Sequence, residues 1–237
     1  MGEDLARFQH PRFARFYIDV STTAERRGAA EHRGRLLAGL SGRVAEIGAG
    51  NGLNFAHYPR EVTEVVAIEP DAVLRAAAER AAADAPVPIT VMAGHADAPP
   101  LGEASVDAVV LSLVLCSVPH PMHALAEVRR VLRAGGQVRF YEHVRSRFRI
   151  VGLLQDVVTP VWRRQAAGCH PNRDTLSTLR SAGFVVEKAE DFGFAPTAWS
   201  PPLRHILGTA TKQGPVTGDQ GDSDQAAPYD PRGRKDP

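Results

Sequence analysis

The 237-residue chain has little that would place it outside the cell or within a membrane. It has two cysteines, too few for a disulfide-stabilised secreted scaffold, and its N-terminus lacks an apolar signal core. No apolar run reaches the roughly 18 residues that span a bilayer. With a formal net charge of +1, the chain also lacks the basic excess typical of nucleic-acid-binding proteins. These absences predict a cytoplasmic protein without a transmembrane segment or a nucleic-acid partner.

Composition divides the chain into three parts. Residues 1–40 mix arginine, alanine and a few aromatic residues at helical spacing, which predicts an N-terminal helical extension or lid. Residues 41–212 carry a regular hydrophobic pattern and are the predicted main domain. Residues 213–237 are rich in glycine, proline, aspartate and glutamine with almost nothing apolar to bury, so we expect a disordered tail.

Residues 41–212 alternate between two kinds of segment. Short β-branched runs predict buried strands, and alanine- and leucine-rich segments predict helices. Strands alternating with helices imply right-handed crossovers, and therefore an α/β fold with a mostly parallel sheet. The expected strands are 43–48, 64–70, 88–94, 106–115, 137–144, 184–191 and 204–212. The expected helices are 71–85, 121–136 and 172–183, the second of them ending at Gly135 and Gly136.

Three glycines crowd together directly after the first expected strand, in the stretch VAEIGAGNGLNF (44–55). Gly48, Gly50 and Gly52 let the backbone approach a ligand closely. A dinucleotide-binding loop needs its last glycine where Leu53 stands, and the chain has no Gly-Lys-Ser/Thr sequence for a phosphate-binding loop. The loop therefore favours a ligand without a pyrophosphate.

An acidic residue ends the second expected strand. Glu69 stands where a carboxylate can accept hydrogen bonds from both hydroxyls of a ribose. Ligands of a parallel sheet bind at the carboxyl ends of the strands, which places the glycine loop, Glu69, Gly94 and the pair Glu142-His143 around one crevice. The alternative is a tight turn followed by an exposed acid. The position of both elements at strand ends favours a nucleoside ligand.

Five segments, in order, resemble the class I S-adenosylmethionine-dependent methyltransferases, in their methyltransferase type 11-like group. They are AEIGAGNG, VVAIEPD, AGHADAPPL, SVDAVVLSLVL and EVRRVLRAGGQV, all within residues 40–212. The resemblance implies a Rossmann-like, doubly wound, mostly parallel seven-stranded sheet with an N-terminal helical extension, and S-adenosyl-L-methionine as the cofactor. The cofactor-binding residues that it implies are Glu46, Gly48, Gly50, Gly52, Asn54, Glu69, Pro70, His95, Ala96, Asp97 and Leu113.

By that resemblance, the three glycines line the methionine end of the cofactor, Glu69 holds the ribose, and residues 95–97 flank the adenine. One position departs from the family. Members often have Gly-Asp-Ala where this chain has Gly94-His95-Ala96, so His95 replaces the carboxylate that usually meets the adenine amino group. Asp97 or a backbone group is left to make that contact.

The second half of the chain resembles the small-thiol methyltransferases of the methyltransferase-like group. The resemblance rests on LVLCSV (113–118), EHV (142–144), Gly168-Cys169 and the final RHILGTATK. Those relatives carry an N-terminal membrane anchor that we do not find in this chain. The resemblance implies an enzyme that methylates a small-molecule acceptor, with an alkyl thiol as the leading candidate. The alternatives are a methyltransferase for a carbon, oxygen or nitrogen of a quinone or lipid, and a module that binds S-adenosylmethionine without turnover.

Glu142 and His143 are the predicted catalytic residues, because they end the fifth expected strand at the crevice. Histidine has an unperturbed pKa of about 6.5, which suits it to take a proton at neutral pH. The structural alternative is a strand-end histidine that bonds only to backbone. A thiol acceptor needs little help from a base, since a few per cent of it is already thiolate near neutrality.

The stretch CSVPHPMH leaves a metal site as an alternative. Cys116, His120 and His123, together with Cys169-His170, have the residue types of a zinc site. Class I methyltransferases usually need no metal, so we expect none here.

An apolar stretch flanked by arginines covers residues 149–165. We expect it to form a helix over the acceptor pocket. Peripheral contact with a membrane is the alternative.

Overall fold

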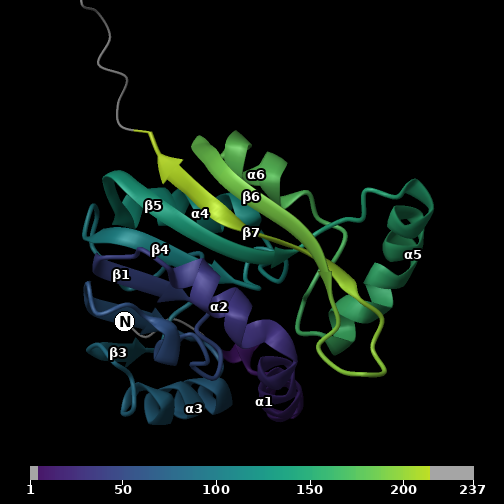
Figure 1. The fold of residues 1–237 in the computed structure, drawn as a ribbon, viewed down its shortest axis with the longest axis horizontal. Coiled ribbons are helices and arrows are strands. Elements are labelled where there is room, and N and C mark those ends of the chain that lie inside the picture. Colours follow the sequence, from purple (N-terminus) through teal and green to yellow (C-terminus); the bar gives the residue numbers. More distant parts are fainter. Residues whose placement is uncertain (1–4, 214–237) are drawn as a thin grey trace, which may run out of the picture.

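The computed structural model describes residues 5–213, and in that range the chain forms a seven-stranded sheet with helices on both faces (Figure 1). The strand order is β3-β2-β1-β4-β5-β7-β6. β7 is antiparallel to both of its neighbours, and all other pairs are parallel. This arrangement confirms the predicted fold class. The strands are β1 (Gly42–Ile47), β2 (Val62–Ile68), β3 (Ile89–Met92), β4 (Val106–Ser112), β5 (Leu132–His143), β6 (Phe184–Phe194) and β7 (Leu203–Lys212).

Helices fill most of the connections and precede the sheet. The predicted N-terminal helical extension is present as α1 and α2, which meet at a kink where Gly28 has a φ of 119°. Short 3₁₀ turns cover Ala6–Phe8 and Phe55–His57. The α-helices are α1 (Pro11–Ala24), α2 (Ala30–Leu37), α3 (Ala72–Ala82), α4 (Pro121–Val131), α5 (Arg149–Gln165) and α6 (Thr175–Ser181).

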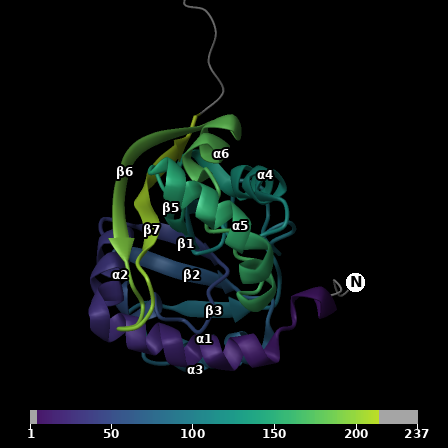
Figure 2. The same ribbon diagram turned by 90° about the vertical axis from the view of Figure 1, so that its right-hand side faces the viewer.

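The side chains of the central strands alternate between two apolar layers. Val109 belongs to the layer that includes Leu125 of α4 and Leu179 of α6. Its neighbour Val110 belongs to the opposite layer, which includes Leu36 of α2. In Figure 2, α4 and α6 lie on one side of the sheet and α2 on the other. Both faces are covered, which is why the strand sequences are almost continuously apolar.

The helix expected over 121–136 is shorter than predicted. α4 ends at Val131, and β5 begins at Leu132, whose ψ of 137° is extended. The Ser105 amide donates to the Val131 carbonyl at 2.8 Å, so the loop before β4 satisfies the last helical turn. Gly135, which was expected at the helix stop, has a φ of 72° and lies where the register of β5 against β4 shifts.

The N-terminal segment crosses the carboxyl edge of the sheet. Gln9 donates to the Pro70 carbonyl at 2.8 Å and accepts from the Ala72 amide at 3.0 Å. The His10 amide donates to Asp71 at 2.8 Å. Further along the chain, α1 runs beside α3 (Figure 2). The segment therefore lies against the end of β2, next to the predicted cofactor site.

The three predicted parts of the chain stay predictions. α1 and α2 fall within 1–40, and all seven strands fall within 41–212. Apart from Gln213, the predicted disordered tail over 213–237 lies outside the described residues.

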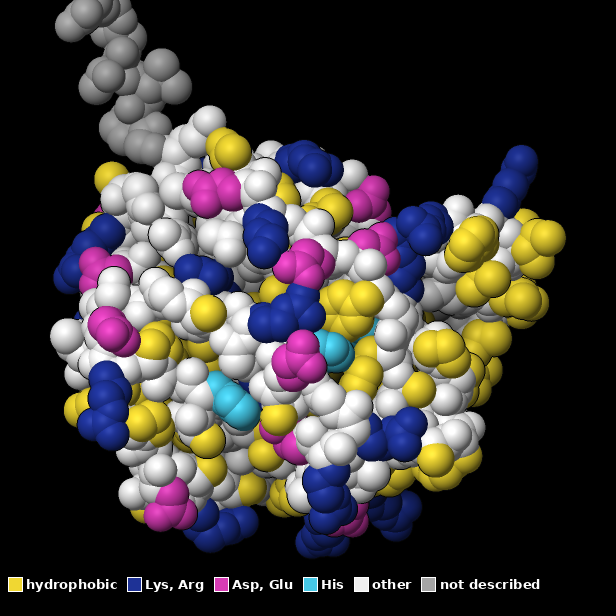
Figure 3. Space-filling view, in the orientation of Figure 1, with side chains coloured by type: hydrophobic (Ala, Val, Ile, Leu, Met, Phe, Trp, Pro, Cys, Tyr) yellow, Lys and Arg dark blue, Asp and Glu magenta, His cyan; other side chains and the backbone are white. Residues whose placement is uncertain are grey.

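α5 turns a polar face to the protein and an apolar face to solvent. Gln155 donates to the Pro171 carbonyl at 3.0 Å, and Asp156 forms an ion pair with Arg145. Figures 1 and 3 show α5 standing away from the rest of the molecule, with apolar side chains gathered on it. The helix expected over the acceptor pocket exposes most of its apolar residues, namely Ile150, Val151, Leu153, Leu154, Val157, Val158 and Val161. Within the described residues, no helix has both the length and the apolar character to cross a membrane.

Candidate active site

The glycine loop runs from the end of β1 to the turn at Phe55–His57. Its glycines have left-handed backbones, with φ values of 71° at Gly48, 60° at Gly50 and 80° at Gly52. The space beside the loop is also restricted, because a Cβ built on Gly48 would lie 2.7 Å from the Cγ2 of Val114. A side chain at Gly48 would therefore clash with Val114 and displace the loop whose backbone can approach a ligand.

Glu69 follows β2 and faces the glycine loop. Its Oε2 accepts a hydrogen bond from the Gly50 amide at 2.8 Å, and its Oε1 accepts one from the Asp71 amide at 2.9 Å. The residue is 5% exposed, so it is not the exposed acid of the alternative interpretation. Burial raises the pKa of Glu69 to about 7, against the opposing effect of the two amides.

The predicted adenine end follows β3. His95 accepts a hydrogen bond from the Asp97 amide at 3.2 Å, and its ring lies 4.9 Å from that of Phe8. The Oδ1 of Asp97 is buried and has no hydrogen-bond partner within the described part of the chain. An unpaired buried carboxylate oxygen is a suitable acceptor for an amino group such as that of adenine. The glycine cradle, Glu69 and Asp97 together fit S-adenosylmethionine, whereas direct contacts from Pro70 and Ala96 stay predictions.

A buried series of polar side chains supports the loop from behind. Arg33 donates to Glu25 at 2.7 Å and to Asn54 at 2.8 Å, and Asn54 donates to Glu46 at 2.7 Å. Tyr58 donates to the second oxygen of Glu46 at 2.7 Å. Burial raises the pKa of Glu46 to about 7. Cofactor contacts from Glu46 and Asn54 stay predictions, while their observed bonds hold the loop in place.

Tyr17 and Arg33 were not predicted as site residues. The Tyr17 ring carbon Cε1 lies 3.5 Å from where a Cβ on Gly50 would stand, so the ring lies over the glycine loop. Burial raises the pKa of Tyr17, and the charges of Arg33, Glu69 and Cys116 also act on it. No motif marks these residues, because the segment around them is rich in arginine and aromatic residues throughout.

Glu142 builds the turn after β4. Leu113 leaves the strand with a φ of 60°, and its amide donates to the Tyr141 carbonyl at 2.7 Å. The next three amides, of residues 114–116, donate to Glu142 at 3.0, 2.8 and 3.0 Å. β4 therefore ends at Ser112 and not at 115 as expected. Catalysis by Glu142 and cofactor contact by Leu113 stay predictions; the observed bonds make Glu142 the support of the turn.

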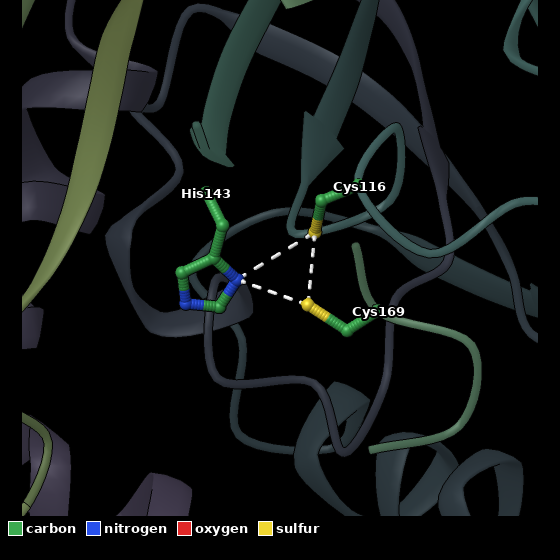
Figure 4. A group of neighbouring side chains, drawn as sticks. All are labelled: Cys116, His143 and Cys169. Atoms are coloured by element: carbon green, nitrogen blue, oxygen red, sulfur yellow. Dashed lines mark hydrogen bonds between the residues drawn. The ribbon is translucent and has the colours of Figure 1, made fainter. Parts of the chain in front are cut away.

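Cys116, His143 and Cys169 come from three separate segments and point toward one another (Figure 4). The His143 Nδ1 lies 3.6 Å from the Cys116 sulfur and 3.5 Å from the Cys169 sulfur, and the sulfurs are 3.8 Å apart. Both cysteines are buried and free of disulfides. The hydrogen bond between the thiols raises the pKa of Cys116, to which burial adds, and lowers the pKa of Cys169.

His120 and His123 lie outside this group. They are exposed at the start of α4, with ring centroids 5.3 Å apart. Among the described residues, the metal-binding side chains that gather within reach of one ion are Cys116, His143 and Cys169. The zinc site that the sequence left as an alternative is not assembled with His120 and His123, which do not lie with Cys116. The base role predicted for His143 stays a prediction.

The site has two ends joined by one short piece of backbone. At the first end, the glycine loop, Glu69 and Asp97 offer a place for a nucleoside. At the second end, two thiols surround an imidazole nitrogen. Val114 links the two ends, because its side chain faces Gly48 and Cys116 follows it two residues later in the chain. Such a site can bring a sulfur-binding group next to the sulfur end of a nucleoside cofactor.

Known proteins are similar to this chain in sequence or in fold. The family model described as "Methyltransferase domain" matches residues 45–140. The human thiol S-methyltransferase TMT1B is 36% identical over 182 residues, which cover 74% of this chain and 74% of that protein. The human thiol S-methyltransferase TMT1A is 34% identical over 184 residues, with the same coverage. The demethylmenaquinone methyltransferase of Renibacterium salmoninarum is 34% identical over 96 residues, covering 40% of this chain and 39% of that protein.

Two solved structures show the same fold at low identity. The YcgJ protein of Bacillus subtilis superposes with a TM-score of 0.65 and 15% identity, over 78% of this chain and 99% of that chain. A geranyl diphosphate methyltransferase in complex with S-adenosylmethionine superposes with a TM-score of 0.62 and 14% identity, over 78% of this chain and 84% of that chain.

Proposed function

The chain belongs to the S-adenosylmethionine-dependent methyltransferases, and we propose that it methylates the sulfur of a small alkyl thiol. Its cofactor is S-adenosyl-L-methionine. The observation that carries the thiol acceptor is the similarity to thiol S-methyltransferases over 182 residues. That length greatly exceeds the range 45–140 of the domain model, so the similarity includes much of the chain outside the cofactor motifs.

At the cofactor end, each group has a proposed partner. The backbone of the glycine loop would hold the methionine part, Glu69 would accept from the ribose hydroxyls, and Asp97 would accept from the adenine amino group. When bound, S-adenosylmethionine supplies a methyl group on a cationic sulfur, which leaves as a neutral thioether. The residues of the chain have to bind and orient the cofactor and the acceptor, and they have to exclude water from the site.

Positioning is the main contribution of the chain to methyl transfer. Holding reactants in line is worth up to about 7–11 kcal/mol in well-oriented systems. Glu142 fixes residues 114–116 through three hydrogen bonds, so the backbone that carries Cys116 cannot shift without breaking them. In our proposal the acceptor sulfur lies beside Cys116, His143 and Cys169.

A matched pair of acceptors tests the proposal. We expect the purified protein to turn over an alkyl thiol at least about 100-fold faster than the alcohol of equal chain length, because a thiol loses its proton far more readily than an alcohol and its thiolate is the better nucleophile. Formation of S-adenosylhomocysteine is the readout, with a phenol, a quinone and a lipid amine in parallel. Turnover of the quinone without turnover of the thiol would show that the acceptor is a quinone, and the chain would still belong to the methyltransferase family.

Cofactor affinity should fall as the pH is lowered through the pKa of Glu69. With a pKa of about 7 in the free protein, Glu69 is mostly a carboxylate at pH 8 and mostly protonated at pH 6. We expect affinity to fall by about 10-fold over that interval, since the charged form is the better acceptor for ribose hydroxyls. Calorimetry with wild type and Glu69→Gln measures this.

The ratio of wild-type affinity to Glu69→Gln affinity at each pH cancels the effect of any titration of the ligand itself. This ratio should fall from pH 8 to pH 6, because wild-type affinity falls as Glu69 is protonated and the glutamine does not titrate. Asp71 and Arg75, which flank Glu69, are the same in both proteins. A constant ratio from pH 8 to pH 6 would show that Glu69 does not bind the ribose.

Peripheral membrane contact through α5 is also part of the proposal. Its exposed apolar residues lie between arginines 147 and 149 at one end and arginines 163 and 164 at the other, an arrangement that suits an interface with anionic lipid. The two free cysteines support the predicted cytoplasmic location. Vesicles with anionic lipid should retain wild type in sedimentation and lose the variant Leu154→Asp, Val157→Asp. Equal retention of both proteins would contradict the contact.

A further inference from the structure

The donor atoms of Cys116, His143 and Cys169 are spaced like three corners of a tetrahedron around a metal ion. Zinc binds thiolate sulfur at about 2.3 Å and imidazole nitrogen at about 2.0–2.1 Å in tetrahedral sites. That geometry places two sulfurs about 3.8 Å apart and a sulfur and a nitrogen about 3.5–3.6 Å apart. The observed separations are 3.8 Å for the sulfurs and 3.6 and 3.5 Å from Nδ1 to each sulfur. All three edges match.

Hydrogen bonding alone does not require this arrangement. The Nδ1 of a neutral imidazole either donates one proton or accepts one, so it can serve one thiol well. Here it lies almost equally far from Cys116 and Cys169. The thiols are not joined in a disulfide, and both are buried. A cation shared by the three groups accounts for all three distances.

The backbone around the group is fixed before any ion arrives. The Cys116 amide donates to Glu142 at 3.0 Å, and its carbonyl accepts from the His170 amide at 2.6 Å. Gly168, with a φ of 88°, lets the loop before Cys169 approach this turn, because a Cβ there would lie 2.8 Å from the Ser117 carbonyl oxygen. His143 ends β5 next to the buried Glu142. These hydrogen bonds and the close approach at Gly168 hold the three donors in place without an ion.

We propose that Cys116, Cys169 and His143 bind one zinc ion and that the sulfur of the thiol acceptor takes its fourth position. Soft thiolates with an imidazole select zinc over magnesium or calcium, which prefer oxygen ligands. Three protein ligands with one open position are the pattern of catalytic zinc sites. Two thiolates neutralise the ion, which suits the buried setting. The acceptor half of this proposal rests on the proposed function, and the metal half does not.

Metal binding would change how the acceptor is activated. The thiol releases its proton to solvent as its sulfur binds zinc. A bond then forms between this sulfur and the methyl carbon while the bond from that carbon to the sulfonium breaks, and the bonding pair stays on the cofactor sulfur. The thioether product is neutral and a weaker ligand, so it leaves. His143 then serves as a metal ligand, in place of the base predicted from the sequence.

Zinc binding to the full chain is the first test. The protein is prepared without added metal in a non-thiol reductant, and its affinity for Zn²⁺ is measured by competition with a chelating dye. We expect one zinc per chain, with affinity at least about 100-fold weaker in Cys169→Ser and in His143→Gln. His123→Gln, which changes an exposed histidine outside the group, should match wild type. Thermal melting of each apoprotein checks that it is folded, and wild-type affinity in either folded ligand variant would overturn the site.

Cobalt in place of zinc tests the open position. The Co²⁺ protein should show a thiolate-to-metal charge-transfer band that grows when an alkyl thiol is added and stays unchanged when the matching alcohol is added. A band that does not respond to the thiol overturns the acceptor half. Thiol turnover that persists in protein shown by mass spectrometry to be metal-free overturns the metal role and leaves the proposed function standing. Thiol ligation without methyl transfer defeats the proposed function and leaves the metal site standing.

Discussion

Replacing Gly48 by alanine should weaken S-adenosylmethionine binding and turnover by on the order of 100-fold, because a displaced loop misplaces the reacting groups. The new Cβ would lie 2.7 Å from the Val114 side chain, and the Val114 amide is bonded to Glu142, so the neighbour cannot retreat freely. The left-handed backbone, with a φ of 71°, adds about 1–2 kcal/mol of strain. Calorimetry and thermal denaturation measure the two effects.

Gly39 offers a matched control for this substitution. Its φ of 73° is equally left-handed, yet a Cβ there would meet nothing within 4 Å. Gly39→Ala should therefore show the same backbone strain, without the clash and without loss of cofactor affinity. Adding Val114→Ala to Gly48→Ala should restore part of the affinity by removing the clash. Wild-type affinity in Gly48→Ala would show that the loop does not cradle the cofactor.

Replacing Glu142 by alanine should lower the free energy of unfolding by about 3–5 kcal/mol, since it leaves three buried amides without an acceptor. The same change frees the turn that carries Cys116, so turnover should be lost even at temperatures where the variant is folded. Glu142→Gln should cost less, because its carbonyl oxygen can still accept from residues 114 and 115, which share one carboxylate oxygen in the wild type. Denaturant titration and thiol turnover at low temperature are the measurements.

Glu79 provides the control for the loss of a glutamate. It is exposed on α3, and Glu79→Ala should change neither stability nor turnover appreciably. If Glu142→Ala unfolded at the same denaturant concentration as wild type, the three amides would not depend on the carboxylate, and its positioning role would have to be withdrawn.

Hydrophobic pattern located the strands better than it located their ends. β4 was expected to continue through residue 115, since Leu113, Val114 and Leu115 are apolar like the strand itself. The chain turns instead, because the amides of residues 114–116 donate hydrogen bonds to a distant residue, Glu142. A local pattern does not contain such a tertiary effect. The early end of α4 has the same origin, because a loop 26 positions before Val131 supplies the amide that satisfies its last turn.

The two ends of the site differed in how far the sequence could predict them. The glycine loop and Glu69 are recognisable because neighbouring residues in the chain carry the chemistry. The second end brings together Cys116, His143 and Cys169, which are far apart in sequence, and the histidines nearest to Cys116 in the chain lie outside the group. Only the fold shows which histidine faces the thiols.

The most direct test of the account follows the methyl group itself. Wild-type protein is incubated with an alkyl thiol and S-adenosylmethionine that carries a trideuteromethyl group, and mass spectrometry measures both products. Thiol methylation by the protein predicts a trideuteromethyl thioether formed in equal amount to S-adenosylhomocysteine, with neither product formed without the protein. Label that appears on a quinone, on a lipid or on no acceptor at all, while the thiol stays unmodified, would contradict it.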